Sequence, residues 1–156
     1  MTTTETAKGK VYQFESSSAA DTIRCGHEIA RLLKPPKLMI MHGDLGAGKT
    51  TLVKGIAEAL DAAEPDEVTS PTFTLIHEYE GKFGGKPVRL YHLDLYRVDT
   101  ERQLDTLGLD ELIGPDSIIL VEWGDKFPWV AKRGQGAIMM CTAGGDKRKI
   151  TVTLKD

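Results

Sequence analysis

A short run of glycines, a lysine and a threonine is the part of this chain whose residue types and spacing point most directly to chemistry. Gly43, Gly48, Lys49 and Thr50 match the pattern G-x-x-x-x-G-K-[ST] in full. Glycines let the chain curl so that successive backbone N–H groups point toward an anion. A lysine ammonium there reaches the β- and γ-phosphates, and a threonine hydroxyl is a ligand for Mg²⁺. The pattern predicts a P-loop, which binds a nucleoside triphosphate.

A triphosphate site also needs a second anchor for its magnesium ion, commonly a carboxylate at the end of an apolar strand. Two residues fit this description: Glu122 follows the apolar run 118–121, and Asp94 follows the run 88–93. The residues alone leave both open, because a carboxylate at a strand end also serves to bond backbone N–H groups. Zinc at His92-x-Asp94 is not expected, because no third ligand lies at a suitable spacing.

Two smaller features are of interest for the same site. The stretch Thr69-Ser70-Pro71-Thr72-Phe73 is rich in hydroxyl groups, which is typical of a loop that senses a γ-phosphate but also of a plain turn. Trp123 follows Glu122 and is suited either to stacking on a base or partner or to packing.

The chain contains no asparagine, so the Asn-Lys-x-Asp motif that commonly selects guanine is impossible and ATP is the expected nucleotide.

A P-loop needs a strand before it and a helix after it, and the flanking residues supply both. The apolar run at 37–41 is short enough to be a buried strand, and residues 49–60 carry an apolar face at helical spacing. Ser18 and Asp21 have capping-box spacing for an earlier helix that ends before Pro35-Pro36. Further elements are expected as strands at 11–14, 74–79, 88–93, 118–122, 137–142 and 150–154, and as a helical region at 99–112 broken near Gly108.

Helices interleaved with short apolar strands predict an α/β fold. We expect a single-domain P-loop NTPase-like sandwich, with a mixed parallel and antiparallel sheet flanked by helices. Residues 74–79 and 88–93 are expected to form a hairpin whose loop contains Gly81, Gly84 and Gly85. The predicted domain covers residues 10–156, and residues 1–9 are predicted to be a flexible tail.

Composition excludes several other classes of protein. The 156 residues are 40% hydrophobic and 28% charged, which rules out long disorder and collagen. No apolar run reaches the roughly 18 residues that a membrane helix needs, and residues 1–10 contain no apolar core for a signal peptide. We therefore expect a cytoplasmic protein with no membrane partner, in which Cys25 and Cys141 are buried, reduced thiols.

Contact with nucleic acid is expected to be indirect or weak. The net charge is −3, and residues 51–110 carry more acidic than basic side chains. A protein that grips nucleic acid by itself usually has a basic face. The clusters available for one are small, namely Lys132-Arg133 and Lys147-Arg148-Lys149.

Five blocks in a fixed order resemble the TsaE family, also called YjeE, the bacterial P-loop ATPase of tRNA threonylcarbamoyladenosine synthesis. The blocks are 43–51, 69–75, 91–97, 107–111 and 120–123. The resemblance is close over residues 18–123 and loose in the C-terminal strands. It implies an ATP-hydrolysing subunit that uses Mg²⁺ and supports turnover of the TsaB–TsaD heterodimer, which transfers the threonylcarbamoyl group to the adenosine next to the anticodon.

The same resemblance implies a set of site residues. Lys49, Asp94 and Glu122 are the expected catalytic residues, and Thr50 and Glu122 the expected ligands of Mg²⁺. Asp94 is expected near the γ-phosphate, where it helps to place water or metal. Residues 18–22 are expected near the adenine, and residues 145–148 are expected to close over the nucleotide. The nucleotide-binding set is Asp44, Leu45, Gly46, Ala47, Gly48, Lys49, Thr50, Thr51 and Asp94.

Two alternatives to a switch ATPase use the same phosphate loop. A small-molecule kinase would pass the phosphoryl group to an acceptor hydroxyl, but the arginines after the P-loop helix are not paired at the spacing typical of a kinase lid. A sensor that binds ATP without hydrolysis would release no phosphate, even with partners. Phosphate release from ATP, with and without TsaB–TsaD, separates the three hypotheses.

Overall fold

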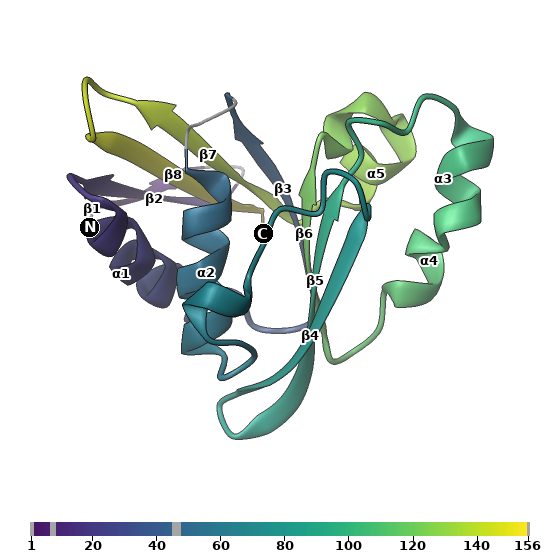
Figure 1. The fold of residues 1–156 in the computed structure, drawn as a ribbon, viewed down its shortest axis with the longest axis horizontal. Helices are drawn as coiled ribbons and strands as arrows, with labels where there is room; N and C mark the ends of the chain where they lie inside the picture. The colour runs from purple at the N-terminus through teal and green to yellow at the C-terminus, as the bar shows by residue number, and fades with distance from the viewer. Residues whose placement is uncertain (1, 7–8, 45–47, 156) are drawn as a thin grey trace.

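In the computed structural model, which describes residues 2–6, 9–44 and 48–155, eight strands form one mixed sheet (Figure 1). The spatial order is β1-β2-β8-β7-β3-β6-β5-β4. The pairs β3–β6, β3–β7 and β5–β6 are parallel and the other neighbours are antiparallel. The strands are β1 Thr2–Thr6, β2 Gly9–Ser16, β3 Lys37–Gly43, β4 Ile76–Phe83, β5 Lys86–Asp94, β6 Ser117–Glu122, β7 Gly136–Thr142 and β8 Arg148–Lys155.

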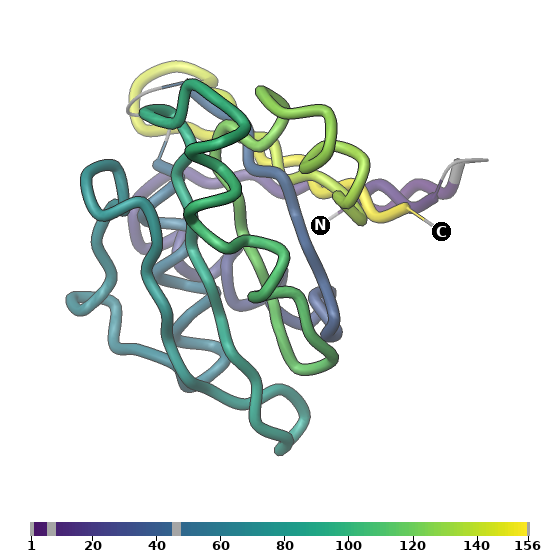
Figure 2. The backbone as a smooth tube through the Cα atoms, turned by 90° about the vertical axis from the view of Figure 1, so that its right-hand side faces the viewer, coloured from purple at the N-terminus to yellow at the C-terminus, as the bar shows by residue number. Residues whose placement is uncertain are grey.

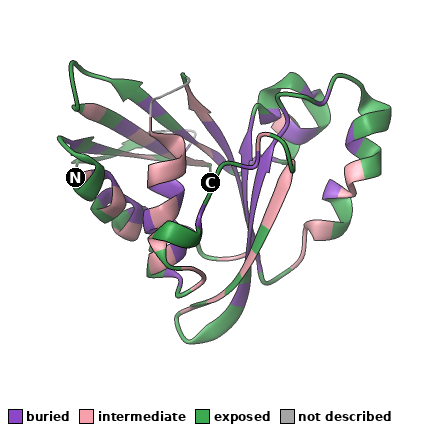
Figure 3. Cartoon of the chain, in the orientation of Figure 1, coloured by how far each residue is buried: buried purple, intermediate pink, exposed green. Residues whose placement is uncertain are grey.

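Helices cover both faces of this sheet and create two cores. The helices α1 Ala19–Ala30 and α2 Lys49–Ala59 pack on one face, and α3 Glu101–Leu107, α4 Leu109–Leu112 and α5 Pro128–Arg133 pack on the other. Two 3₁₀ turns, η1 Pro65–Glu67 and η2 Gly124–Lys126, complete the connections. Figure 3 shows that buried residues run along the central strands between the two layers. The predicted fold class, an α/β sandwich with a mixed sheet, is confirmed.

Two glycines allow α1 and α2 to pack at unusually close range. A Cβ atom on Gly26 would lie 2.6 Å from the carbonyl oxygen of Leu52, and one on Gly55 would lie 2.1 Å from that of Ile23. Both distances are too short for any side chain, so the backbones of the helices meet directly. Ser18 caps α1 as predicted, because its Oγ accepts from the backbone N–H of Asp21 at 3.0 Å. Helix α2, which begins at Lys49, therefore packs closely against α1.

The parallel strands β5 and β6 bring polar side chains to the same face of the sheet. Asp94 and Glu122 are register partners, each at the C-terminal end of its strand. Alternate side chains of a strand share a face, so His92 lies on the same face as Asp94. Leu90 on that face packs with the core under α1 and α2, whereas Tyr91 belongs to the opposite core. The ends of β5 and β6 thus place His92, Asp94 and Glu122 toward the layer that contains α2.

The predicted hairpin of β4 and β5 is confirmed, but its strands are longer than expected. The turn contains Gly84 and Gly85, which have φ angles of 57° and 81°. Gly81 was expected in the loop and instead lies inside β4, beside the end of α2. In both Figure 1 and Figure 2 the hairpin turn is the lowest part of the chain, far from the strand ends that carry Asp94.

The N-terminal region and one cysteine differ from expectation. Residues 1–9 were predicted to be a flexible tail, but Thr2–Thr6 form β1, which pairs with β2. Threonines are β-branched and favour a strand where the edge of β2 offers backbone partners.

Both described cysteines are free, and Cys25 is buried as expected, whereas Cys141 near the end of β7 is exposed. Within the described residues, no helix is long and apolar enough to cross a membrane.

Candidate nucleotide-binding site

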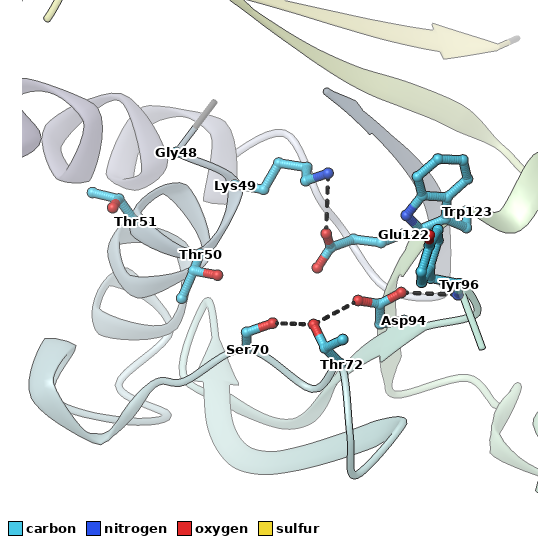
Figure 4. Close-up of a pocket in the computed structure, with 10 residues that line it drawn as sticks. All are labelled: Gly48, Lys49, Thr50, Thr51, Ser70, Thr72, Asp94, Tyr96, Glu122 and Trp123. Carbon is cyan, nitrogen blue, oxygen red and sulfur yellow. Dashed lines mark hydrogen bonds and ion pairs between the residues drawn. The ribbon is translucent and has the colours of Figure 1, made fainter. Parts of the chain in front are cut away.

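A cavity of about 690 Å³ opens where the N-terminus of α2 faces the C-terminal ends of β5 and β6 (Figure 4). Sites in open α/β sheets commonly lie outside the carboxyl ends of the strands, as this one does. Its lining falls into two parts, which we name the phosphate wall and the carboxylate wall. The phosphate wall is Gly48, Lys49, Thr50 and Thr51, and the carboxylate wall is Ser70, Thr72, Asp94, Tyr96, Glu122 and Trp123.

The phosphate wall is an uncapped helix N-terminus. Gly48 is the N-cap residue, with a left-handed φ of 98°, and in the described part of the chain no side-chain cap bonds the first N–H groups of α2. The first turn of this helix also contains no acidic residue. The first N–H groups of a helix lack partners within the helix and carry its positive dipole end, so they attract anions. The phosphate wall therefore offers a site for a phosphate group.

Lys49 reaches from the phosphate wall across the cavity. Its Nζ donates to the backbone oxygen of Gly43 at 2.5 Å and lies 3.4 Å from Oε1 of Glu122. Figure 4 shows the Lys49 and Glu122 side chains pointing toward one another. The two are largely buried, with side-chain exposures of 13% and 7%. A lysine held between two oxygen acceptors at the entrance of α2 is positioned to exchange them for phosphate oxygens.

Glu122 is held from two sides. Its Oε2 accepts from Nε2 of His92 at 2.6 Å, while Oε1 faces Lys49. Burial by itself raises the pKa of Glu122, but the hydrogen bond and charge of His92, with the charge of Lys49, outweigh burial and lower that pKa below its usual value. The site therefore keeps Glu122 ionised at neutral pH, which makes it a hard oxygen donor.

Asp94 is fixed by two hydrogen bonds and keeps acceptor capacity. Its Oδ2 accepts from the hydroxyl of Thr72 at 3.1 Å, and its Oδ1 accepts from the backbone N–H of Tyr96 at 2.9 Å. The residue is only 4% exposed. A carboxylate has about four lone-pair positions, so two remain for a water molecule or another donor in the cavity.

The loop of residues 69–75 lies over Asp94 and is tied to β4. Thr72 contacts Asp94 through its side chain. The loop is also bound to Asp94 through the backbone, because the N–H of Asp94 donates to the backbone oxygen of Leu75 at 3.0 Å. His77 of β4 bonds the hydroxyl of Thr74 at 2.7 Å and the backbone oxygen of Thr69 at 3.2 Å. The loop that the sequence describes as either a switch or a plain turn is thus in contact with a carboxylate of the cavity.

Two aromatic rings form the rim of the carboxylate wall. Tyr96 and Trp123 have ring centroids 5.1 Å apart, and both side chains are exposed. Next to them, the guanidinium of Arg97 lies 4.3 Å above the ring of Phe73, the most exposed aromatic residue described. Trp123 is a candidate from the sequence but Tyr96 is not, since a single tyrosine just after a strand carries no signal of its own.

The other predicted site residues are only partly brought together. Asp44 is exposed and does not line the cavity. Leu45, Gly46 and Ala47 lie outside the described residues. Arg148 comes close to the phosphate wall, because its Nε would be 4.0 Å from a Cβ atom placed on Gly48. Residues 18–22 belong to the start of α1 and are absent from the described lining of this cavity.

Comparison with known proteins identifies the family. Residues 16–150 match the family described as Threonylcarbamoyl adenosine biosynthesis protein TsaE. The chain belongs to the TsaE family. Proteins with the name tRNA threonylcarbamoyladenosine biosynthesis protein TsaE share 44% identity over 109 residues in Aquifex aeolicus and 35% over 137 residues in Treponema pallidum. These alignments cover 70% and 88% of this chain, and 74% and 96% of the relatives.

A crystal structure supports the same family assignment at the level of the fold. Bacillus subtilis YdiB superposes with a TM-score of 0.67 and 31% identity, over 97% of this chain and 90% of the other. A TsaE protein of the same species, Bacillus subtilis, is 42% identical over 124 residues. The resemblance stated from five sequence blocks is therefore confirmed as family membership.

Proposed function

We propose that this TsaE-family protein binds ATP with Mg²⁺, hydrolyses it, and thereby supports the synthesis of threonylcarbamoyladenosine in tRNA. The pathway is supported by the family match and by the names of relatives at 35–44% identity. By family resemblance we expect this protein to act in the cytoplasm. The lining of the cavity supports the proposed binding and hydrolysis of ATP.

The observation that carries the proposal is the uncapped N-terminus of α2 facing two buried carboxylates. An anion at the phosphate wall would accept from the first N–H groups of α2 and from Lys49. Two negative groups, Asp94 and Glu122, lie on the opposite wall with exposures of 4% and 5%. Bringing a triphosphate against two carboxylates is unfavourable unless a cation lies between them. The charge pattern therefore fits a nucleotide that arrives with a metal ion.

The available donors fit Mg²⁺. Thr50 and Glu122 line the same cavity and offer hard oxygen atoms, which Mg²⁺ prefers over nitrogen or sulfur. Among the described residues no group of three His, Cys, Asp or Glu forms a metal site. Mg²⁺ in nucleotide sites is usually held by one or two protein oxygens together with phosphates and water, so no larger cluster is needed. Bound there, Mg²⁺ would neutralise negative charge on the β- and γ-phosphate oxygens.

Hydrolysis would then depend on how this chain's residues place water. A water oxygen attacks the γ-phosphorus, the bond from that phosphorus to the β,γ-bridging oxygen breaks, and ADP, phosphate and a proton leave. Asp94 has free acceptor positions to orient the water, while Thr72 and the N–H of Tyr96 hold its carboxylate still. Lys49 would leave Gly43 and Glu122 to bind phosphate oxygens, which stabilises the charge that develops there.

The proposed function also includes a partner protein that binds near the cavity. TsaB–TsaD is the expected partner by family resemblance. The exposed rings of Tyr96 and Trp123 lie at the rim of the cavity, and Phe73 projects from the loop that contacts Asp94. A change between ATP and ADP that moves this loop would alter the surface offered to a partner, which is what coupling of hydrolysis to binding requires.

The test is phosphate release from ATP by this protein alone and with TsaB–TsaD from the same organism. We expect slow release alone, a clear rise with the pair, and no release by the Lys49→Ala variant. Binding of ATP without release under either condition would contradict hydrolysis and favour a sensor. Transfer of the γ-phosphate to a metabolite instead of water would favour a kinase.

A further inference from the structure

His92 is a histidine with no exposed surface and one polar contact. Its relative exposure is 0%, and Nε2 lies 2.6 Å from Oε2 of Glu122. Within the described part of the chain, Nδ1 of His92 is the buried side-chain nitrogen or oxygen that lacks a hydrogen-bond partner. The residue lies on β5, two positions before Asp94 and on the same face of the sheet. None of the sequence motifs gave this side chain a role.

The direction of the hydrogen bond follows from the chemistry of the two groups. An ionised carboxylate only accepts hydrogen bonds, so the Nε2–H group of His92 donates this hydrogen bond to Oε2 of Glu122. The other nitrogen is buried without a partner among the described residues, which destabilises the folded state. A leucine would fill this apolar position without that cost. The contact with Glu122 is therefore the one interaction of His92 that uses its polar chemistry.

Because of this contact, the two oxygens of Glu122 have different partners. Oε2 is held by His92 from inside the sheet, and Oε1 is 3.4 Å from Lys49 on the cavity side. A carboxylate released from His92 would be able to rotate and present both oxygens to the Lys49 ammonium. The orientation in which Oε1 alone faces the cavity thus depends on the histidine.

We propose that His92 is a positioning residue for nucleotide binding: its Nε2–H holds Oε2 of Glu122 so that Oε1 is presented to the cavity for Mg²⁺. The inference rests on the proposed function, because it gives Glu122 a metal-binding role. Partners of metal-binding carboxylates and histidines typically change metal affinity or activity by about 10–100-fold when they are removed. His92 acts through Glu122 and does not itself contact the nucleotide.

Two variants of equal polarity separate a positioning role from a structural one. His92→Gln places an amide N–H close to the position of Nε2, whereas His92→Asn places it close to Nδ1, which is out of reach of Glu122. Both leave a buried amide in the same strand. Leu90→Ala is the matched control for loss of stability, because Leu90 is fully buried on the same face of β5 and belongs to the apolar core.

The measurement is the affinity of a fluorescent ATP analogue, first in EDTA and then across a series of Mg²⁺ concentrations, with thermal unfolding of each variant. We expect His92→Asn to raise the half-saturating Mg²⁺ concentration about 10-fold or more, and His92→Gln to stay within about 3-fold of the wild type. The affinity in EDTA should stay nearly constant for both variants, and Leu90→Ala should lower the melting temperature without changing the Mg²⁺ dependence.

Equal Mg²⁺ dependence of the Gln and Asn variants, whether both resemble the wild type or both are impaired, would overturn the inference and leave the proposed function standing. A parallel loss of affinity in EDTA and in Mg²⁺ would do the same, since it indicates a general structural effect. A wild-type protein whose ATP affinity does not respond to Mg²⁺ would instead contradict the proposed function, and this inference with it.

Discussion

The phosphate wall and the carboxylate wall of the cavity are built in different ways. The phosphate wall is a contiguous segment, Gly48 to Thr51, at the start of one helix. The carboxylate wall comes from three segments, namely the loop before β4 and the ends of β5 and β6. The first wall is positioned by the packing of α2 on α1, where glycines let the helices approach closely. The second exists because parallel pairing puts Asp94 beside Glu122.

Under the proposed function, ATP binding and ATP hydrolysis should depend on different walls of the cavity. The positive groups of the phosphate wall, namely the first backbone N–H groups of α2 and Lys49, attract an anion. The carboxylate wall carries negative charge, which repels an anion, so in the proposed function it orients water and Mg²⁺. Changes to the phosphate wall should therefore abolish ATP binding, whereas changes to the carboxylate wall should mainly alter the Mg²⁺ dependence of binding or slow hydrolysis.

The largest effect is expected from Lys49→Ala. In the proposed complex the Lys49 ammonium contacts two phosphate groups. Charge-assisted contacts contribute about 2 kcal/mol each, so losing both should lower ATP affinity about 1,000-fold. Calorimetric titration with ATP measures this loss. Lys54→Ala, which removes a lysine from the same helix outside the cavity, is the control and should bind like the wild type. Normal ATP affinity in Lys49→Ala would remove the phosphate wall from the account.

Asp94→Asn should separate the two walls most clearly. An amide keeps the size and one acceptor oxygen but loses the charge that orients water, so we expect phosphate release to fall about 100-fold with ATP affinity unchanged or higher. Single-turnover phosphate release with TsaB–TsaD measures the rate, and a binding titration measures the ATP affinity. Asp99→Asn is the control, since Asp99 is exposed just beyond the same strand. Equal losses in binding and release would show that the walls do not act separately.

The effect of Glu122→Gln on ATP binding should differ between metal-free and Mg²⁺-containing solution. In EDTA the loss of a negative charge near the triphosphate should raise ATP affinity several-fold, whereas the half-saturating Mg²⁺ concentration should rise about 10-fold. Titration of a fluorescent ATP analogue under both conditions measures the two effects. A variant that loses affinity in EDTA as much as in Mg²⁺ would contradict a metal-binding role for Glu122.

The smallest effect is expected from Thr72→Val, which removes a hydrogen bond of 3.1 Å to Asp94 while keeping the shape of the side chain. One such bond contributes about 1 kcal/mol, so phosphate release should slow about 5-fold. Thr72→Ser keeps the hydroxyl and should restore most of the rate. Loss of rate in both variants, or in neither, would show that the hydroxyl does not support Asp94.

The parts of the molecule that could be predicted are those specified by local sequence. The P-loop motif, the strand before it and α2 after it follow from residues that are neighbours in the chain. Asp94 and Glu122 were predicted as candidates because each ends an apolar strand, and the break at Gly108 was predicted and lies between α3 and α4.

The remaining features depend on contacts that no local pattern contains. The link from His92 to Glu122 requires the pairing of β5 with β6. Strand β1 forms on the edge of β2, and six-residue α5, which begins at Pro128, is too short to show helical periodicity. Tyr96 enters the lining only because the chain turns after β5, where its N–H bonds Asp94.

The central claim is that one triphosphate lies between the two walls. A crystal structure with Mg²⁺ and a non-hydrolysable ATP analogue tests it most directly. The account predicts phosphate oxygens within hydrogen-bond distance of Lys49 Nζ and of the first N–H groups of α2. It also predicts Mg²⁺ beside Thr50 and Glu122, bound directly or through water, with Oε2 of Glu122 still on His92. A triphosphate bound elsewhere, or Mg²⁺ remote from both Thr50 and Glu122, would contradict it.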